Sequence, residues 1–175
     1  MASPDTSDSL APRIRVMQII GSALVMGLLI FMGVSLFLRT TGKFRNPPPD
    51  VPIISYVAAG FCGIQLIAFF FVPGIMVKAG RRRIGANVGP LGAGLVSAHS
   101  TGSLCGLYQT SMIVGDALLE GAALFLIIAF LIEGELIALL LAVFLLIILI
   151  LQIPTRSRVE RWIERQQELL TQEQV

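Results

Sequence analysis

The stretch that decides the fold is LIALLLAVFLLIILILQI, residues 136–153, which contains no charged side chain. A helix needs about 20 apolar residues to cross the roughly 30 Å hydrocarbon core of a bilayer. Three further stretches meet this requirement, at residues 16–38, 51–77 and 107–132. The sequence therefore predicts an all-α integral membrane protein that crosses the bilayer four times.

Composition supports a membrane as the natural solvent for this chain. Its 175 residues fit one domain, and 55% hydrophobic and 14% charged residues lie outside the range of soluble globular domains. The net charge is +2, but the basic residues stand in short clusters between apolar runs, which does not indicate nucleic-acid binding. Residues 1–12 are polar and are predicted to be a disordered tail. The apolar run after them is too long for a signal peptide and is expected to remain as an anchor.

The connections between the apolar stretches predict two helical hairpins. Pro47, Pro48 and Pro49 cannot continue a helix and separate the first two spans. Glu133, Gly134 and Glu135 alone separate the last two, which predicts a tight turn between antiparallel neighbours. Residues 13–154 are therefore expected to form a four-helix transmembrane bundle.

Basic residues are distributed unevenly between the two sides of this topology. Ten of the 13 lie before the first span, after the second or after the fourth, and the other three lie between the first two spans: Arg39, Lys43 and Arg45. The positive-inside rule then places both termini in the cytoplasm. The predicted location is the inner (plasma) membrane of a bacterial cell.

An internal repeat relates the two hairpins. With an offset of 94 residues, six of the thirteen positions 19–31 are identical in 113–125. Each copy keeps a small-residue pair, Ala23 with Gly27 and Ala117 with Gly121, and such pairs let helices approach closely. We expect the first and third spans to touch there, although glycine and alanine are also common throughout membrane helices.

The second copy differs from the first by two acidic residues. Asp116 and Glu120 replace Ser22 and Met26, and their spacing of four places both on one helix face near the middle of the third span. An ionised carboxylate at the bilayer centre costs roughly 2.5–3.5 kcal/mol, so at least one of the pair is expected to be protonated. The pair is a candidate proton or cation site. The alternative is a buried carboxyl group that only hydrogen-bonds neighbouring helices.

Three polar side chains within the other spans are candidate hydrogen-bond partners of this pair: Gln65, Tyr56 and Ser22. Cys62 and Cys105 lie in or beside apolar runs without the spacing of a disulfide framework or zinc site, and we interpret them as packing residues. No metal site or cofactor is predicted.

Two further segments have alternative interpretations. Residues 155–175 predict a cytoplasmic amphipathic helix, in which Trp162 would anchor the chain at the membrane interface; the alternative is a solvated tail that packs on nothing. The glycine-rich stretch 79–106 is expected to be a flexible cytoplasmic loop that holds His99, or else a re-entrant segment.

Catalytic and nucleotide-binding motifs do not occur in this sequence. The glycines form neither a Gly-x-x-x-x-Gly-Lys nor a Gly-x-Gly-x-x-Gly pattern, so no nucleotide partner is predicted. Asp116 has no second intramembrane aspartate, and His99 lies outside the spans, so an intramembrane protease is not predicted. The chain is not expected to be an enzyme.

Two resemblances attach to the acidic helix. The block Ala117-Leu118-Leu119-Glu120-Gly121-Ala122-Ala123-Leu124-Phe125 resembles the carboxylate-bearing helix of the proteolipid c subunits of rotary ATPases, which would assign ion binding to Glu120. Here Glu120 lies in the first helix of its hairpin rather than the second. Together with the exit Pro154-Thr155-Arg156, the block also resembles four-span bacterial membrane proteins without an established activity.

The sequence leaves two functions open. One is proton- or cation-linked transport or sensing through Glu120, with Asp116 beside it. The other is a structural membrane protein that binds copies of itself or another membrane protein through its small-residue faces and its C-terminal helix. In both, the lipid bilayer is a partner.

Overall fold

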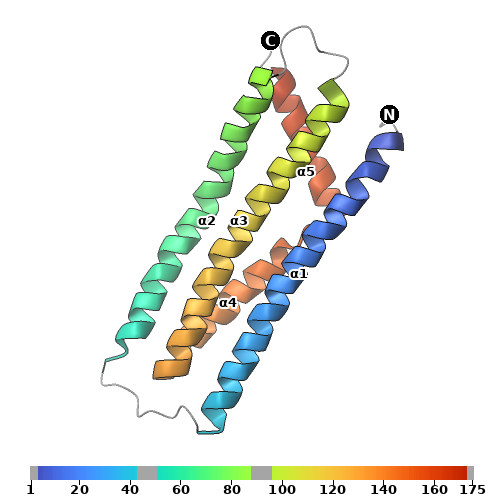
Figure 1. Ribbon diagram of the computed structural model, residues 1–175. Coiled ribbons are helices and arrows are strands. Elements are labelled where there is room, and N and C mark those ends of the chain that lie inside the picture. Colours follow the sequence, from blue (N-terminus) through green and yellow to red (C-terminus); the bar gives the residue numbers. More distant parts are fainter. Residues whose placement is uncertain (1–3, 43–50, 88–95, 173–175) are drawn as a thin grey trace. The chain divides into compact units, whose positions relative to one another are not determined.

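The structure is a computed structural model that describes residues 4–42, 51–87 and 96–172. Within these ranges the chain forms five helices and no strand. The helices are α1 (Pro4–Thr40), α2 (Ile53–Asn87), α3 (Val96–Glu133), α4 (Leu136–Gln152) and α5 (Arg156–Gln172), as shown in Figure 1. The all-α prediction is confirmed for the described residues.

Helix α1 begins much earlier than the first predicted span. It starts at Pro4, so the prediction of a disordered tail over residues 1–12 is wrong for residues 4–12. Proline is well accommodated in the first turn of a helix, and Asp5 and Asp8 carry the negative charge that the amino end of a helix favours. Pro12 lies inside α1 without ending it.

Helices α2 and α3 take up most of the predicted loop 79–106. Helix α2 continues to Asn87 and α3 begins at Val96, so His99 lies on a helix and only residues 88–95 fall outside the described ranges. Neither the flexible loop nor the re-entrant segment describes the helical part of this stretch. Its single glycines each weaken a helix by only about 1 kcal/mol, which neighbouring helix-forming residues can offset.

The predicted tight turn between the third and fourth spans is confirmed. Helix α3 ends at Glu133, and Gly134 has a φ of 80°, in the left-handed region that glycine occupies at little cost. The backbone N–H of Gly134 donates to the carbonyl oxygen of Phe130 at 2.8 Å, which is a common end to a helix. The predicted turn at Pro47–Pro49 lies outside the described residues.

Among the described residues, three helices are long and apolar enough to cross a membrane: Ile14–Thr40, Ile53–Gly80 and Gly102–Glu133. Helix α4 has 17 residues, or about 26 Å at 1.5 Å per residue, because the Gly134 turn and Pro154 bound it. It meets the same requirement only together with Ser157–Gln166. The stretch with the plainest apolar sequence is thus the shortest of the four predicted spans, and the described chain has three spans or up to four.

The spanning helices expose large apolar side chains, as expected for surfaces that face lipid. Phe70, Phe71 and Leu151 are 74%, 65% and 68% exposed, and many other large apolar side chains are exposed as well. Their contact with water would cost free energy. The chain is therefore a membrane-embedded helical protein.

The chain divides into two compact units, and residues 20–71 and 115–153 form one of them, which we call the span unit. Its apolar core draws on all four helices α1 to α4. Five alanines of α3 and α4 are almost fully buried in this core: Ala122, Ala123, Ala129, Ala138 and Ala142. Such small side chains allow helices in a membrane to pack closely. The duplication of the hairpin stays a prediction.

Residues 1–19, 72–114 and 154–175 form the other compact unit, which we call the terminal unit. Its core contains Ile14 and Met17 of α1, Cys105 of α3, and Val159 and Ile163 of α5. Helix α5 therefore packs on protein through its apolar face, and the alternative of a tail that packs on nothing is wrong. Both cysteines are free and buried, in accord with a packing role.

Within the terminal unit, α1 also contacts the segment that leads into α5. The side-chain amide of Gln18 donates to the carbonyl oxygen of Pro154 at 3.0 Å, and Pro154 is fully buried. This bond satisfies the carbonyl group of a buried residue in the segment that leads into α5.

Candidate functional site

The candidate site is the carboxylate pair on α3. Asp116 and Glu120 both lie within one helical turn of the midpoint of the apolar segment Gly102–Glu133. Asp116 is only 1% exposed, whereas Glu120 is half-buried. Since residues four apart on a helix are neighbours, the two carboxyl groups share one face of α3.

One oxygen of Asp116 lacks a hydrogen bond. Its Oδ1 atom is buried and has no partner among the described residues. A buried polar atom without a partner costs about 1–3 kcal/mol, and more if the group carries a charge. Exceptions of this kind in a native structure call for an explanation, such as a functional role or an ion that binds there. Among the described residues, Asp116 shares this feature with the hydroxyl groups of Ser35 and Ser55, but of these three it alone can carry a negative charge as a carboxylate.

The structure does not bring the three predicted partners into hydrogen bonds with this pair. Tyr56, in the first turn of α2, is 67% exposed; Ser22 on α1 is also exposed; and Gln65 on α2 is half-buried. Within the described chain, none of them satisfies Oδ1 of Asp116.

The small-residue pairs do not make the predicted contact between α1 and α3. Ala23, Gly27, Ala117 and Gly121 are all exposed. A Cβ atom added to either glycine would meet nothing within 4 Å outside its own helix. The close packing that we expected at these residues is instead provided by the buried alanines of α3 and α4, and the two glycine faces are open.

An arginine at the end of α1 caps the end of α3, a contact that the sequence did not reveal. The guanidinium of Arg39 donates from Nη1 to the carbonyl oxygens of Phe130 and Leu131 at 3.2 and 3.1 Å, and from Nη2 to that of Glu133 at 3.2 Å. It also lies 5.4 Å from the centroid of the Phe130 ring. A cation at these carbonyls satisfies orphan acceptors and complements the helix dipole.

Glu133 makes the complementary contact at the start of α2. Its Oε1 and Oε2 atoms accept the backbone N–H groups of Ile54 and Ser55, both at 2.7 Å. Glu133 is 4% exposed, so these charge-assisted bonds are sheltered. We call Arg39 and Glu133 with their backbone partners the end clamp. It joins α1, α2 and α3 at one end of the span unit.

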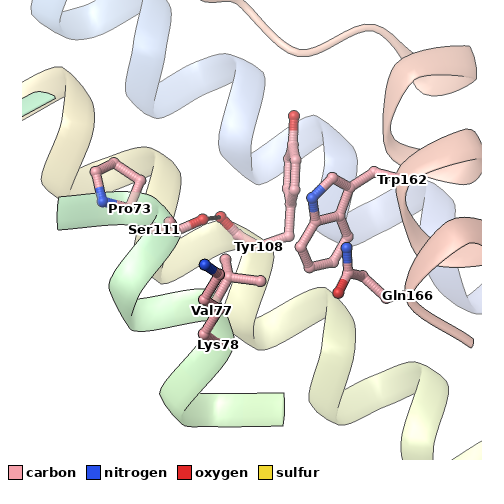
Figure 2. A pocket seen from close by; sticks show the side chains of 8 residues that line it. Pro73, Val77, Lys78, Tyr108, Ser111, Trp162 and Gln166 are labelled. Atoms are coloured by element: carbon pink, nitrogen blue, oxygen red, sulfur yellow. Dashed lines mark hydrogen bonds between the residues drawn. The ribbon is translucent and has the colours of Figure 1, made fainter. Parts of the chain in front are cut away.

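Trp162, the predicted interface anchor, lies on α5 in the terminal unit. Its side chain is half-buried, and its ring centroid is 5.0 Å from that of Tyr108 on α3, with the planes inclined at 59°. Figure 2 shows the two rings beside one another. An aromatic pair at this distance contributes about 0.5–1.5 kcal/mol beyond the area that it buries.

In the part of the chain that the structure describes, no group of three or more His, Cys, Asp or Glu side chains could hold a metal ion. No family model matches the chain, and neither a curated protein nor a solved structure matches it.

Proposed function

We propose that this protein is a multi-pass membrane protein that reversibly binds a proton or a cation at Asp116 and Glu120, and that it links this binding to transport or sensing. The observation that carries the proposal is the buried Oδ1 atom of Asp116, which has no partner among the described residues. A bound proton or cation offsets the cost of that unpaired atom. Acidic residues within spans serve proton and ion pathways, which supports this assignment over a purely structural one.

The proposed roles of the two acids differ. Glu120 is half-buried and exchanges the ion, whereas the fully buried Asp116 sets the affinity through its charge four residues away. The proposal includes no catalytic step and no resident cofactor.

A flux measurement tests this proposal. We would reconstitute the full chain into liposomes that contain a pH-sensitive dye, impose a membrane potential and follow the internal pH. Asp116→Asn and Glu120→Gln should each abolish proton entry, while Glu135→Gln, a matched loss of a carboxylate in the turn outside the apolar segment, should leave it intact. Equal entry in all four proteins would contradict the proposal.

The proposed topology has four crossings in the inner (plasma) membrane, with both termini in the cytoplasm. The distribution of basic residues supports it. In intact cells, a membrane-impermeant maleimide should label Glu135→Cys, whereas Arg158→Cys should react only after the cells are opened. Cys62 and Cys105 are buried and provide a low background. Labelling of both positions from outside would refute the topology.

A second candidate function is assembly with a copy of this chain or with another membrane protein. The observation that favours it is the open space beside Gly27 and Gly121, because exposed small residues let a helix of another chain approach closely. Gly27→Leu and Gly121→Leu should then shift the protein to monomers. Gly33→Leu is the control, since Gly33 is exposed on α1 with equal space but outside the Ala-x-x-x-Gly pairs. A purified wild-type protein that is monomeric would rule out assembly with a copy of this chain.

A further inference from the structure

A pocket of ≈ 350 Å³ lies within the terminal unit. Helices α2, α3 and α5 form its walls. The residues that line it include Pro73, Lys78, Tyr108, Ser111, Trp162 and Gln166. Figure 2 shows the rings of Tyr108 and Trp162 beside Gln166, with Lys78 and Val77 on the α2 side. The volume falls in the range of about 300–1,000 Å³ that is usual for small-molecule sites.

The pocket lies near the ends of two apolar helical segments. Lys78 is two residues from the end of the apolar segment Ile53–Gly80, and Tyr108 is six residues from the start of Gly102–Glu133. Tyrosine and tryptophan are enriched at the level of lipid headgroups, and an amphipathic helix lies at that level too. In the proposed topology, we therefore expect the pocket at the level of the lipid headgroups.

The chemistry of the wall suits an anion that carries an apolar body. Lys78 supplies one positive charge, and none of the described residues that line the pocket carries a carboxylate. The hydroxyl of Ser111 donates to the carbonyl oxygen of Tyr108 at 2.8 Å, which fixes that turn of α3. Pro73 and the two aromatic rings form the apolar part of the wall. Trp162 also carries an indole N–H donor.

We propose that this pocket binds the phosphate headgroup of an anionic phospholipid, with Lys78 against the phosphate and with Trp162 and Tyr108 against the glycerol and the first carbons of the acyl chains. Basic pockets between helices at a membrane surface recognise lipid headgroups in this way. Free phosphate fits less well, because a single lysine faces it and most of the wall is apolar. The site is separate from Asp116 and Glu120, and this inference does not depend on their role.

The chain carries its own reporter for the test, because Trp162 is its only tryptophan. We would place the full-length protein in nanodiscs of phosphatidylcholine and record its emission while adding dioctanoyl phosphatidylglycerol. Dioctanoyl phosphatidylcholine and inorganic phosphate form the two comparison titrations. The expected result is a saturable emission change with phosphatidylglycerol alone.

Two substitutions locate the binding. Lys78→Gln should weaken the apparent affinity for phosphatidylglycerol by about fivefold, the effect expected from one basic residue near a membrane surface. Arg82→Gln removes the same charge one turn further along α2, from an exposed side chain outside the pocket wall, and should change the affinity less than twofold. Native mass spectrometry should show a lipid retained by the wild type and by Arg82→Gln but lost from Lys78→Gln.

Three results would overturn the inference. The first is an equal loss of affinity in Lys78→Gln and Arg82→Gln, which would indicate general surface attraction. The second is a response to inorganic phosphate as large as the response to the lipid, and the third is no difference between the two lipids. An unchanged emission spectrum and helical circular dichroism of Lys78→Gln before lipid addition would show that the variant is folded.

Discussion

Replacing the Glu133 carboxylate should destabilise the span unit more than replacing the Glu135 carboxylate in the same turn. Glu133 accepts two backbone N–H groups of α2 at 2.7 Å while it is 4% exposed. A hydrogen bond to a charged group contributes about 1.5–3 kcal/mol. In Glu133→Gln one oxygen can still accept one N–H group, but the amide nitrogen opposes the other. We expect the free energy of unfolding to fall by about 2–3 kcal/mol.

Glu135→Gln is the matched control for this prediction. Glu135 lies two residues further on, is half-buried, and makes no side-chain capping hydrogen bond at the start of α4. Its replacement should change the free energy of unfolding by less than about 0.5 kcal/mol. Both variants would be unfolded reversibly by sodium dodecyl sulfate in mixed micelles and followed by circular dichroism at the helical band. Equal losses in the two variants would refute the end clamp as a stabilising contact.

Four further substitutions test other parts of the span unit by the same unfolding measurement. Gly134→Ala should lower the free energy of unfolding by at least about 2 kcal/mol, because φ is 80° and a Cβ atom would collide with the guanidinium of Arg39. Its control is Gly121→Ala, in open space within a helix, which should leave the free energy of unfolding unchanged or raise it by up to about 1 kcal/mol. Arg39→Lys should cost about 1–3 kcal/mol, since an ammonium group cannot reproduce the fork that reaches three carbonyl oxygens; a wild-type stability would show that charge alone suffices. Ser35→Ala should not destabilise the protein, because the buried Oγ atom has no partner among the described residues; a loss above about 1 kcal/mol would contradict that reading.

The sequence predicted those features of the fold that depend on local pattern. Apolar length identified the spans, and Gly134 between two acidic residues identified the turn, since both signals lie within a few neighbouring residues. It did not predict where α1 and α3 begin or where α2 ends. The polar parts of these helices, such as residues 4–12 of α1, depend on helix propensity and have no repeating apolar pattern. The apolar pattern of the sequence therefore does not show where these parts begin or end.

The end clamp could not be predicted because its partners are far apart in the chain. Arg39 contacts carbonyl groups 91 to 94 residues away, and Glu133 contacts N–H groups 78 and 79 residues away. A basic residue at the end of an apolar run and an acidic residue before a glycine are the only local signals, and both also serve topology. The sequence therefore identified these residues as flanking charges without identifying what they bind.

The candidate site was predicted in part. The positions of Asp116 and Glu120 followed from the apolar run around them, and helical spacing placed them on one face. The proposed partners failed to form hydrogen bonds because the polar character of Tyr56, Ser22 and Gln65 does not determine the direction in which each side chain points. The predicted contact between α1 and α3 at their small residues was wrong for a similar reason. Gly27 and Gly121 allow close packing but do not specify which helix packs there.

The most direct test of the central claim is the infrared difference spectrum of the carboxyl groups in reconstituted protein as the pH is changed. Isotope labelling of aspartate and glutamate would separate Asp116 from Glu120, with Asp116→Asn and Glu120→Gln as controls. Our account predicts a carboxyl band that appears and disappears reversibly with pH and that is lost in Glu120→Gln. A band that stays constant over the whole accessible pH range would contradict ion exchange and would show Asp116 and Glu120 to be permanent structural groups.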